Sequence, residues 1–477
     1  MKKAYLGIDL GTTGTKSTLF DQFNNEIGRG YKGYELISPF DCAFEQNPLD
    51  WEDAVVESVK GAIGNLDSKV VSLSVSAQGG SFFFADIDKD GKIIPLTNAF
   101  TWMDKRATLE SEELNSKIEK DYFYYRTGSR LGAGSFPAKY LWLKKHNPEI
   151  IEKTKIILST SDYIYYLMTG KFCIDYTSSY MMDVFNVKEK GYDSELLGLI
   201  GLSEDKLPPL MQAGEVIGEM LPEFAEKLGI NKGVKVVCGA HDQYAANIGS
   251  NYFDGSLLIS SGTTWVVFGR SEELALTNSH FASCVHPIKN YGVFSSAVSS
   301  GVVIEWERKL FSVDFEDMNR EIPLRDFQED LLVYPFISGS GGYRGEKSLS
   351  YSIENAIFRY DKFDIIKATM EGVAFEIREI ISCLKKSKIE QDKIIIAGGA
   401  VKSPAWMQIL ANVLGQEIYI SNKPDRCCYG AYSIARYGVE GEFITFEFDG
   451  KVAYPQKELV EKYNQKFIKY SKKFMDK

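Results

Sequence analysis

The stretch "GIDLGTTGTKSTLFD", from Gly7 to Asp21, decides the fold. It differs by one residue from a P-loop, in which the pattern Gly-x-x-x-x-Gly-Lys-[Ser/Thr] places a glycine directly before the lysine. Here Thr15 stands before Lys16, and the residues after Lys16 alternate with a strand period rather than a helical one. The apolar run before the glycines is also typical of a strand. The sequence therefore predicts a hairpin with the small residues 11–14 at its tip.

A hairpin tip of this composition is compatible with two structures. Successive backbone N–H groups in such a turn can form a nest that binds an anion such as phosphate. The alternative is an ordinary glycine-rich turn that binds nothing. The stretch alone does not decide between them.

The same design returns near the middle of the chain. In "SLLISSGTTWVVFG", Ser256 to Gly269, Gly-Thr-Thr again stands between two apolar strands. A hairpin repeated in each half predicts two similarly built domains that face each other across a cleft. Two nests opposed in this way would hold a polyphosphate from both sides, which favours the phosphate-binding interpretation of both turns.

A third stretch, "KIIIAGGAVKSPAWMQILANVLG" from Lys393 to Gly415, predicts a strand, a turn at Gly398-Gly399 and a helix. Ser403 is the expected N-cap, Pro404 stands at the first helical position, and a glycine follows the last turn. Gly399 allows a flat ligand such as a nucleoside to approach the backbone closely. The alternative is a tight turn packed on the sheet.

Elsewhere strands and helices alternate, which indicates an α/β protein. We expect two strands that pair with each other at residues 70–77 and 81–88. We expect helices at residues 52–66 and 148–158, and a strand that runs into a polar loop at residues 235–243.

The composition excludes several function classes. The chain has 477 residues, too many for one core, and a net charge of −10 at pH 7, so binding of nucleic acid by bulk electrostatics is not expected. Its seven cysteines form no Cys-x-x-Cys pair and its four histidines show no metal-ligand spacing, so reduced thiols and a cytoplasmic location are expected, without a structural metal. No apolar run is long enough to span a membrane, and the apolar part of the N-terminus is too short for a signal peptide.

Taken together, the motifs resemble those of the FGGY family of carbohydrate kinases, whose two-domain fold is actin- and hexokinase-like, of the ribonuclease H-like class of ATPases. The resemblance runs nearly end to end. Besides the two phosphate motifs and the adenosine motif, it rests on "EQNPLDW" (45–51), "TWMDKRA" (101–107) and "GAHDQYAANIG" (239–249), in the order of the family. It implies ATP-dependent phosphorylation of a sugar or polyol hydroxyl with Mg²⁺. The N-terminal domain would span residues 1–250 and the C-terminal domain residues 251–477.

The resemblance also implies roles for individual residues. Asp242 would be the catalytic base, and Asp9 would help to place the magnesium ion. The sugar would be held by Asp242 together with Gln78, Trp102, Asp104 and Gln243. The ATP phosphates would contact Thr12, Thr13, Gly14 and Lys16 from one side and Gly262 and Thr263 from the other. The nucleoside would lie against Gly301, Glu305, Gly398, Gly399 and Ser403.

Several of these side chains also have a purely structural interpretation. Asp9 could cap its own turn, although an acid within an apolar strand is costly unless it is paired or bound to metal. Lys16 could be a solvated strand lysine, and Trp102 could belong to the core. Asp104 could form a local ion pair with Arg106, two residues away. His241 is expected to orient its loop rather than to take part in the chemistry.

Residues 78–81 bear on the choice of sugar. Within the family the chain resembles xylulokinases most, and these carry Gln-Met-His-Gly where this chain has Gln78-Gly79-Gly80-Ser81. Glycerol kinases carry an Arg-Glu pair after the matching glutamine, which two glycines do not supply. The missing side chains are expected to leave room for a longer substrate or for water. The resemblance therefore implies a pentulose, with D-xylulose first and with L-xylulose, ribulose, gluconate and erythritol as alternatives.

Two other function classes stay open. The same fold serves ATPases that act as conformational switches, such as chaperone and filament proteins, and these phosphorylate no small molecule. That class does not account for the sugar-sized set of polar and aromatic residues. A sugar sensor without catalysis would be expected to lack Asp9 or Asp242, and both are present. The resemblance also suggests a homodimer, and no nucleic-acid or membrane partner is expected.

Overall fold

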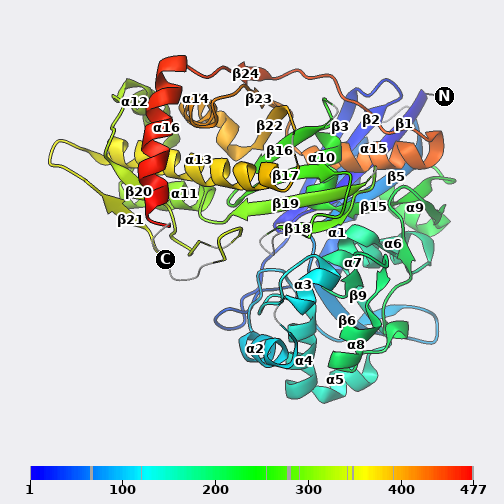
Figure 1. Cartoon of the computed structure of the whole chain (residues 1–477). Helices are drawn as coiled ribbons and strands as arrows, with labels where there is room; N and C mark the ends of the chain where they lie inside the picture. The colour runs from blue at the N-terminus through cyan, green and yellow to red at the C-terminus, as the bar shows by residue number, and fades with distance from the viewer. Residues whose placement is uncertain are drawn as a thin grey trace. The chain divides into compact units, whose positions relative to one another are not determined.

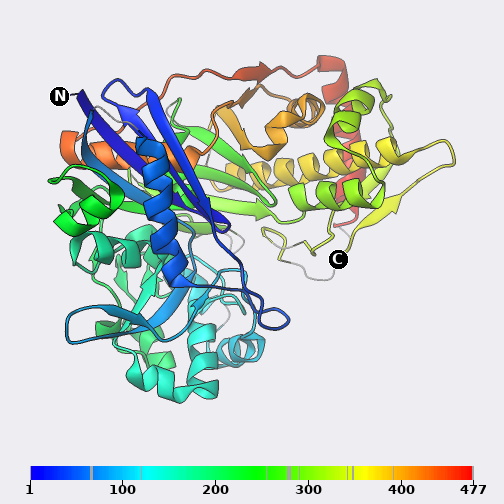
Figure 2. The same ribbon diagram turned by 180° about the vertical axis from the view of Figure 1, so that it is seen from behind.

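The computed structural model describes residues 2–64, 68–119, 121–253, 255–276, 281–288, 290–340, 342–345, 349–389 and 391–474. The chain forms two compact units (Figures 1 and 2). The first comprises Met1–Asn251, Ser283–Tyr291 and Asp425–Phe446, and the second comprises Tyr252–Ala282, Gly292–Pro424 and Glu447–Lys477. The expected division into residues 1–250 and 251–477 stays a prediction. The two units differ from it mainly because residues 425–446 are grouped with the N-terminal part of the chain.

The first unit is built on a six-stranded sheet in the order β14-β15-β5-β1-β2-β3. Its strands are β1 (Lys2–Leu10), β2 (Gly14–Asp21), β3 (Glu26–Gly33), β5 (Ser68–Ala77), β14 (Val216–Glu219) and β15 (Lys235–His241). β1 pairs antiparallel with β2, so the hairpin predicted for residues 7–21 is confirmed. β1 and β15 both pair parallel with β5. The carboxyl ends of these three strands therefore lie at the same end of the sheet.

A second sheet of this unit shows that one predicted strand pair is wrong. It consists of β4 (Glu45–Gln46), β8 (Ala99–Phe100), β6 (Phe82–Ile87) and β7 (Ile93–Pro95), with β9 (Ile156–Ser159) paired to β6. β6 therefore does not pair with β5. The chain leaves the first sheet at the glycine turn between them, where Gly80 has a φ of +68°. The helix predicted for residues 148–158 is also too long, because its last part forms β9.

Helices cover both sheets of the first unit. They are α1 (Pro48–Ile63), α2 (Thr108–Lys117), α3 (Tyr122–Thr127), α4 (Phe136–His146), α5 (Pro148–Lys153), α6 (Thr160–Thr169), α7 (Tyr176–Tyr180), α8 (Ser194–Ile200), α9 (Pro222–Leu228), α10 (Asp242–Gly249) and α15 (Arg426–Glu440). Two short ladders join β10 (Ile174–Asp175) to β13 (Leu210–Met211) and β11 (Phe185–Asn186) to β12 (Gly191–Tyr192). α1 confirms the helix predicted for residues 52–66. α10 begins at Asp242, where a polar loop was predicted, so that expectation is wrong.

α15 packs directly on β1 and α10, although it lies more than 400 residues after β1 in the chain. Two glycines permit this close approach. A Cβ on Gly7 would lie 2.0 Å from the carbonyl oxygen of Cys428, and a Cβ on Gly430 would lie 1.8 Å from that of Ala245. Because both contacts are with backbone atoms, a side chain at Gly7 would force α15 away from β1, and one at Gly430 would force it away from α10.

The second unit is built on a sheet whose strands follow the order β19-β17-β16-β22-β23-β24. These strands are β16 (Ser256–Ser261), β17 (Trp265–Ser271), β19 (Tyr291–Ala297), β22 (Lys393–Gly398), β23 (Ile418–Ile420) and β24 (Lys451–Ala453). A separate pair is formed by β20 (Leu332–Tyr334) and β21 (Ser352–Glu354), and β18 (Ala282–Val285) is grouped with the first unit from Ser283 on. Its helices are α11 (Gly301–Leu310), α12 (Phe315–Glu321), α13 (Lys362–Lys386), α14 (Pro404–Leu414) and α16 (Lys457–Lys472). β16 and β17 pair antiparallel, which confirms the second predicted hairpin.

The caps predicted for α14 are confirmed. The Ser403 side chain accepts a hydrogen bond from the Trp406 N–H at the N-terminus, and Gly415 has a left-handed φ of +67° at the C-terminus. None of the helices in the described part of the chain combines the length and the apolar character that a bilayer crossing requires.

The second unit buries an acid, Glu307 of α11, that no cation pairs in the described residues. Its Oε1 accepts hydrogen bonds of 2.6 Å from both the Tyr351 and the Thr369 hydroxyl groups. Burial outweighs these bonds and raises the pKa of Glu307 to about 7. Since this pKa lies above that of the unfolded chain, the group's contribution to stability is lost as the pH rises from about 4.5 through 7.

We therefore expect Glu307→Gln, which is neutral at every pH and keeps an acceptor oxygen, to become relatively more stable as the pH rises. Between pH 4.5 and pH 8 the unfolding free energy of the variant should gain about 3 kcal/mol on that of the wild type. Scanning calorimetry at the two pH values measures this difference. The exposed Glu316→Gln is the control, and an equal difference at both pH values would show that folding does not raise the pKa of Glu307.

Candidate active site

The ends of three parallel strands bring the predicted acidic and amide side chains together. In the register of the sheet, Asp9 of β1 stands opposite Ser76 of β5, and Ala77 of β5 stands opposite His241 of β15. Gln78 and Asp242 are the next residues of their strands. Ligands of open α/β sheets bind at the carboxyl ends of the strands. Asp9, Gln78 and Asp242 therefore mark the candidate site of the first unit.

Asp9 is an acid in an unusually costly position. Its side chain is buried, and its Oδ1 accepts a hydrogen bond of 3.3 Å from the Ser76 hydroxyl. Burial first, and the neighbouring charge of Asp242 second, raise the pKa of Asp9 to about 7, although the Lys16 ammonium opposes this shift. A cation placed beside the two acids would lower this pKa, as the Lys16 ammonium does. The alternative that Asp9 merely caps its own turn does not account for this environment.

Asp242 is the first residue of α10 and directly follows β15. Its side chain is 26% exposed, and its Oδ1 lies 3.1 Å from Nε2 of His241. The His241 N–H donates a hydrogen bond of 2.8 Å to the Thr177 hydroxyl, which fixes the backbone just before the acid. The neighbouring Gln243 is half-buried and follows Asp242 in the first turn of the helix. The geometry agrees with the expectation that His241 orients this segment.

The first Gly-Thr-Thr turn is held by its carbonyl groups. The carbonyl oxygens of Gly11 and Thr13 accept hydrogen bonds from the hydroxyl and the N–H of Tyr34, and that of Thr12 accepts one of 2.6 Å from Nε2 of Gln46. Because each trans peptide unit points its N–H opposite to its C=O, the N–H groups of residues 12–14 point away from these donors. Gly14 is required here, since a Cβ would lie 2.6 Å from the carbonyl oxygen of Lys32. That these N–H groups form an anion nest stays a prediction.

Gln46 links this turn to the strand end of β5. Its Oε1 accepts hydrogen bonds from Nε2 of Gln78 at 2.7 Å and from Nε1 of Trp51 at 3.1 Å, while its Nε2 binds Thr12 as above. Gln46 is 1% exposed. The Gln78 amide is thereby oriented, and its own Oε1 is buried without a partner in the described structure. The motif at residues 45–51 thus positions two predicted site residues, a role that the sequence did not reveal.

Neither Lys16 nor Trp102 has the purely structural role that was considered for it, a solvated lysine and a core tryptophan. Nζ of Lys16 lies 2.8 Å from Oδ1 of Asp425, which precedes α15 and has a left-handed φ of +56°. Lys16 is thus ion-paired rather than merely solvated, and no pattern near Lys16 indicated this partner. Trp102 is 49% exposed, so it is not a core residue, and its Nε1 donates a hydrogen bond of 3.2 Å to the Thr12 hydroxyl.

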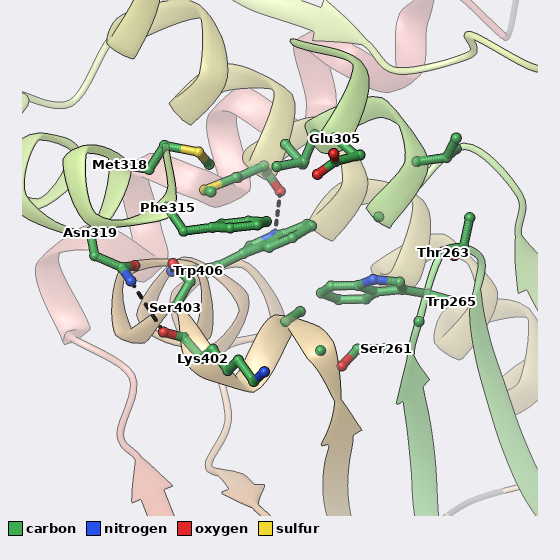
Figure 3. Close-up of a pocket in the computed structure, with 17 residues that line it drawn as sticks. Ser261, Thr263, Trp265, Glu305, Phe315, Met318, Asn319, Lys402, Ser403 and Trp406 are labelled. Atoms are coloured by element: carbon green, nitrogen blue, oxygen red, sulfur yellow. Dashed lines mark hydrogen bonds between the residues drawn. The ribbon is translucent and has the colours of Figure 1, made fainter. Parts of the chain in front are cut away.

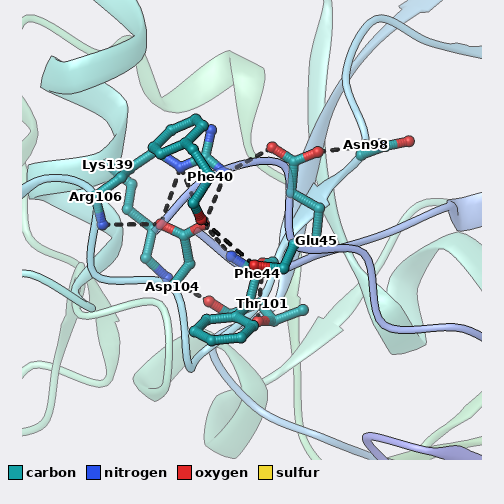
Figure 4. Close-up of polar contacts among 9 residues, drawn as sticks. Phe40, Phe44, Glu45, Asn98, Thr101, Asp104, Arg106 and Lys139 are labelled. Carbon is teal, nitrogen blue, oxygen red and sulfur yellow. Dashed lines mark hydrogen bonds and ion pairs between the residues drawn. The ribbon is translucent and has the colours of Figure 1, made fainter. Parts of the chain in front are cut away.

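Asp104 forms the ion pair that was its structural alternative (Figure 4). Its carboxylate is fully buried and accepts hydrogen bonds from Nε and Nη2 of Arg106 and from the Phe44 N–H. Arg106 also binds Glu45 at 2.6 Å, and Lys139 donates to the Thr101 carbonyl at 2.7 Å. The network holds the segment that presents Trp102. Contact between Asp104 and a sugar stays a prediction.

The glycine pair after Gln78 does not leave the open space that was expected. A Cβ on Gly79 would lie 2.5 Å from Cγ of Met181 and 2.5 Å from Cδ2 of His241. A Cβ on Gly80 would lie 3.4 Å from Cβ of Trp102. Side chains from other parts of the chain therefore occupy the place of the missing ones.

The second unit contains a cavity of about 500 Å³, a size typical of ligand pockets (Figure 3). Aromatic rings form much of its lining: Trp265 and Trp406 lie with ring centroids 4.6 Å apart, and Phe315 stands beside them. The indole N–H of Trp406 donates a hydrogen bond of 3.2 Å to the Met370 carbonyl. The side-chain amide of Asn319 donates one of 3.3 Å to the Lys402 carbonyl. Such a surface suits a flat, largely apolar ring.

The predicted nucleotide residues of the second unit gather at this cavity. Gly262, Thr263, Gly301, Glu305, Gly399 and Ser403 all line it. The Thr263 carbonyl accepts a hydrogen bond of 2.9 Å from the Val302 N–H, and a Cβ on Gly301 would lie 2.2 Å from the carbonyl oxygen of Gly262. Gly398, just before this group, has a φ of +117° that only glycine adopts readily. Glu305 is ion-paired to Arg308 at 2.7 Å.

Comparison with known proteins assigns the chain to a family. The N-terminal domain model of the FGGY family of carbohydrate kinases matches residues 4–249, and its C-terminal domain model matches residues 257–439. The chain belongs to the FGGY family. This FGGY protein therefore has the two-domain actin- and hexokinase-like fold, which confirms the predicted fold class, and kinases of the family use ATP.

Individual relatives of this FGGY protein carry several names. The chain is 26% identical to the xylulose kinase of Bacillus subtilis (98% of this chain, 96% of the relative), 25% to the gluconokinase of Bacillus licheniformis (94% and 90%) and 27% to the probable L-xylulose kinase of Haemophilus influenzae (98% and 98%). Among solved structures, a xylulose kinase from Brucella ovis superposes with a TM-score of 0.91 at 22% identity, covering 98% of both chains. The last likeness concerns the fold alone.

We expect Gln46→Leu to destabilise the FGGY protein, because it leaves the Thr12 carbonyl, the Trp51 N–H and the Gln78 amide without their partners. The loss in unfolding free energy should be about 2–6 kcal/mol, since the buried Trp51 and Gln78 side chains each lose a partner at a cost of roughly 1–3 kcal/mol. Denaturant titration measures it. Gln212→Leu, at an exposed position of the same unit, is the control, and a loss no larger than that of the control would mean that Gln46 is not the link described.

Proposed function

We propose that this protein transfers the γ-phosphoryl group of ATP to a hydroxyl group of a pentulose, with D-xylulose as the first candidate. The observation that carries the proposal is the strand register that brings Asp9, Gln78 and Asp242 to one end of the first sheet. An acid at a strand end, beside amides that can bind hydroxyl groups, is suited to phosphoryl transfer to a sugar. Membership of the FGGY family supports the same chemistry.

Asp242 would orient the acceptor hydroxyl and take its proton late in the reaction. A carboxylate with a pKa near 4 cannot ionise an alcohol with a pKa near 16 beforehand, because the difference of about 12 units corresponds to roughly 16 kcal/mol. That is about the whole barrier of a kinase that turns over ~10 times per second. The hydroxyl oxygen would therefore attack the γ-phosphorus while the bond from that phosphorus to ADP breaks, and the hydroxyl proton would pass to the Asp242 carboxylate late in this step.

The residues of the first unit fit a magnesium ion. Asp9 is buried beside a second acid, and a cation would oppose the rise of its pKa. Within the described residues no group of three or more acidic, histidine or cysteine side chains could hold a metal ion by itself. Mg²⁺ is often bound through one or two carboxylates plus substrate phosphates. Asp9 would hold the ion, which when bound neutralises the charge of the phosphates.

The two Gly-Thr-Thr turns would bind the phosphates of ATP. In the first unit the N–H groups of Thr12, Thr13 and Gly14 would form the nest, with Lys16 as the nearby cation. In the second unit Gly262 and Thr263 would do the same. The nucleoside would lie in the adjoining cavity of the second unit against Gly301, Glu305, Gly398, Gly399 and Ser403. The mutual arrangement of the two turns stays a prediction, because they belong to different units.

The acceptor would be bound by Gln78, Trp102, Asp104, Asp242 and Gln243. The names of the relatives support a sugar or sugar acid, and xylulose kinases recur among them. L-xylulose, ribulose, gluconate and erythritol are the alternatives. Glycerol is disfavoured, because the glycines after Gln78 offer no charged side chain. All seven cysteines are free, which supports a cytoplasmic location, and a homodimer stays a prediction.

We expect Asp242→Asn to lower kcat by about 10²–10⁴-fold, the usual contribution of a general base. The affinity for ATP should change little, since Asp242 contacts the acceptor rather than the nucleotide. Steady-state kinetics and equilibrium binding of ATP measure the two effects. Asp53→Asn, at an exposed position of α1, is the control, and near-normal turnover of Asp242→Asn would contradict the assigned role.

The experiment that tests the function is a coupled assay of ADP release with ATP and magnesium. The acceptors are D-xylulose, L-xylulose, D-ribulose, L-ribulose, gluconate, glycerol and erythritol, with a reaction that contains no acceptor. We expect one pentulose to stand far above the rest and hydrolysis without acceptor to be slow. Fast hydrolysis that no acceptor stimulates would instead favour an ATPase switch.

A further inference from the structure

Met181 takes the place of a side chain that position 79 lacks. Its Cγ lies 2.5 Å from where a Cβ of Gly79 would stand, and Cδ2 of His241 lies equally close on the same side. His241 is in turn 3.1 Å from the Asp242 carboxylate. Met181 is therefore packed at the strand ends, one residue away from the acid to which we assign the proton transfer.

The same methionine also flanks Gly80. A Cβ on Gly80 would lie 3.3 Å from the Met181 carbonyl oxygen and 3.4 Å from Cβ of Trp102. Trp102 is half exposed and Met181 is half-buried, so both still present surface to a ligand. Gly80 thus lies close to a methionine and a tryptophan that are about 80 residues apart in the chain.

Met181 is held firmly by the helix that it follows. It stands at the C-terminal end of α7, where its N–H is bound to the Thr177 carbonyl. Asp175 caps the other end of α7 by accepting hydrogen bonds from the Thr177 and Ser178 N–H groups at 2.8 and 2.9 Å. The Thr177 hydroxyl accepts the His241 N–H, so α7 is bonded directly to the strand end that carries Asp242. The backbone at Met181 is thereby fixed beside this strand end.

We propose that Met181 forms the wall of the acceptor site beside Gly79 and limits the length of the acceptor that this protein phosphorylates. The inference rests on the proposed function and adds to it the residue that sets acceptor size. The thioether is apolar and offers no strong hydrogen bond, so it excludes the end of a long acceptor rather than binding it. Hydroxyl groups are left to the amides of Gln78 and Gln243. The two glycines by themselves would leave room for a longer acceptor, but Met181 fills that room beside Gly79.

The test is Met181→Ala, which removes three heavy atoms from the wall and leaves the backbone of α7 in place. The measured quantity is the ratio of kcat/KM for the six-carbon acceptors D-fructose and D-gluconate to kcat/KM for erythritol and D-xylulose. We expect this ratio to rise at least ten-fold, because one or a few methylene groups in a pocket change such ratios by about 10–200-fold. Met181→Leu, of similar volume, should change it less than three-fold.

Met211→Ala is the matched control, since this methionine of β13 is half-buried in the same unit and is not among the residues nearest to a Cβ on Gly79. It should leave the ratio unchanged. A loss of activity by the same factor for every acceptor, complete inactivity included, would assign Met181 a structural role and overturn the proposal. A wild-type protein that phosphorylates no acceptor would instead contradict the proposed function.

Discussion

The parallel pairing of β1, β5 and β15 is the constraint on which the first unit depends. A slip of one residue in this register would turn every side chain to the opposite face of the sheet. Asp9 would then exchange places with an apolar neighbour, Ile8 or Leu10, both of which are fully buried. The register is thus fixed by the core, and the core thereby decides that an acid and an amide end up beside the residue at the start of α10.

This arrangement has a cost, which the surrounding residues reduce. The sheet buries Asp9 near a second acid, so its pKa lies far above that of a free carboxyl group. The Ser76 hydroxyl and the Lys16 ammonium act in the opposite direction. Lys16 is itself held by Asp425, from the far end of the sequence, and Gly7 lets α15 lie directly on β1. The site of the first unit therefore needs both ends of the chain, which explains why residues 425–446 are grouped with the N-terminal part.

Local signals were enough to predict the two hairpins and the caps of α14, because a turn composition or a cap depends on neighbours in the sequence. Long-range packing was not predictable in the same way. Nothing local distinguishes β6 as a strand of another sheet, and nothing near Lys16 indicates Asp425. Asp104 carried a family motif, yet its burial under Arg106 depends on Glu45 and on aromatic rings from three other segments. The filling of the space beside Gly79 by Met181 was hidden for the same reason.

The central claim is that the Asp242 carboxylate receives the proton of the acceptor hydroxyl. The most direct measurement is a crystal structure of the protein with its acceptor sugar and a non-hydrolysable ATP analogue. The account predicts one sugar hydroxyl within hydrogen-bond reach of the Asp242 carboxylate, about 2.6–3.2 Å between oxygens, and turned toward the terminal phosphate. A sugar bound with no hydroxyl within reach of Asp242, directly or through one water, would contradict it.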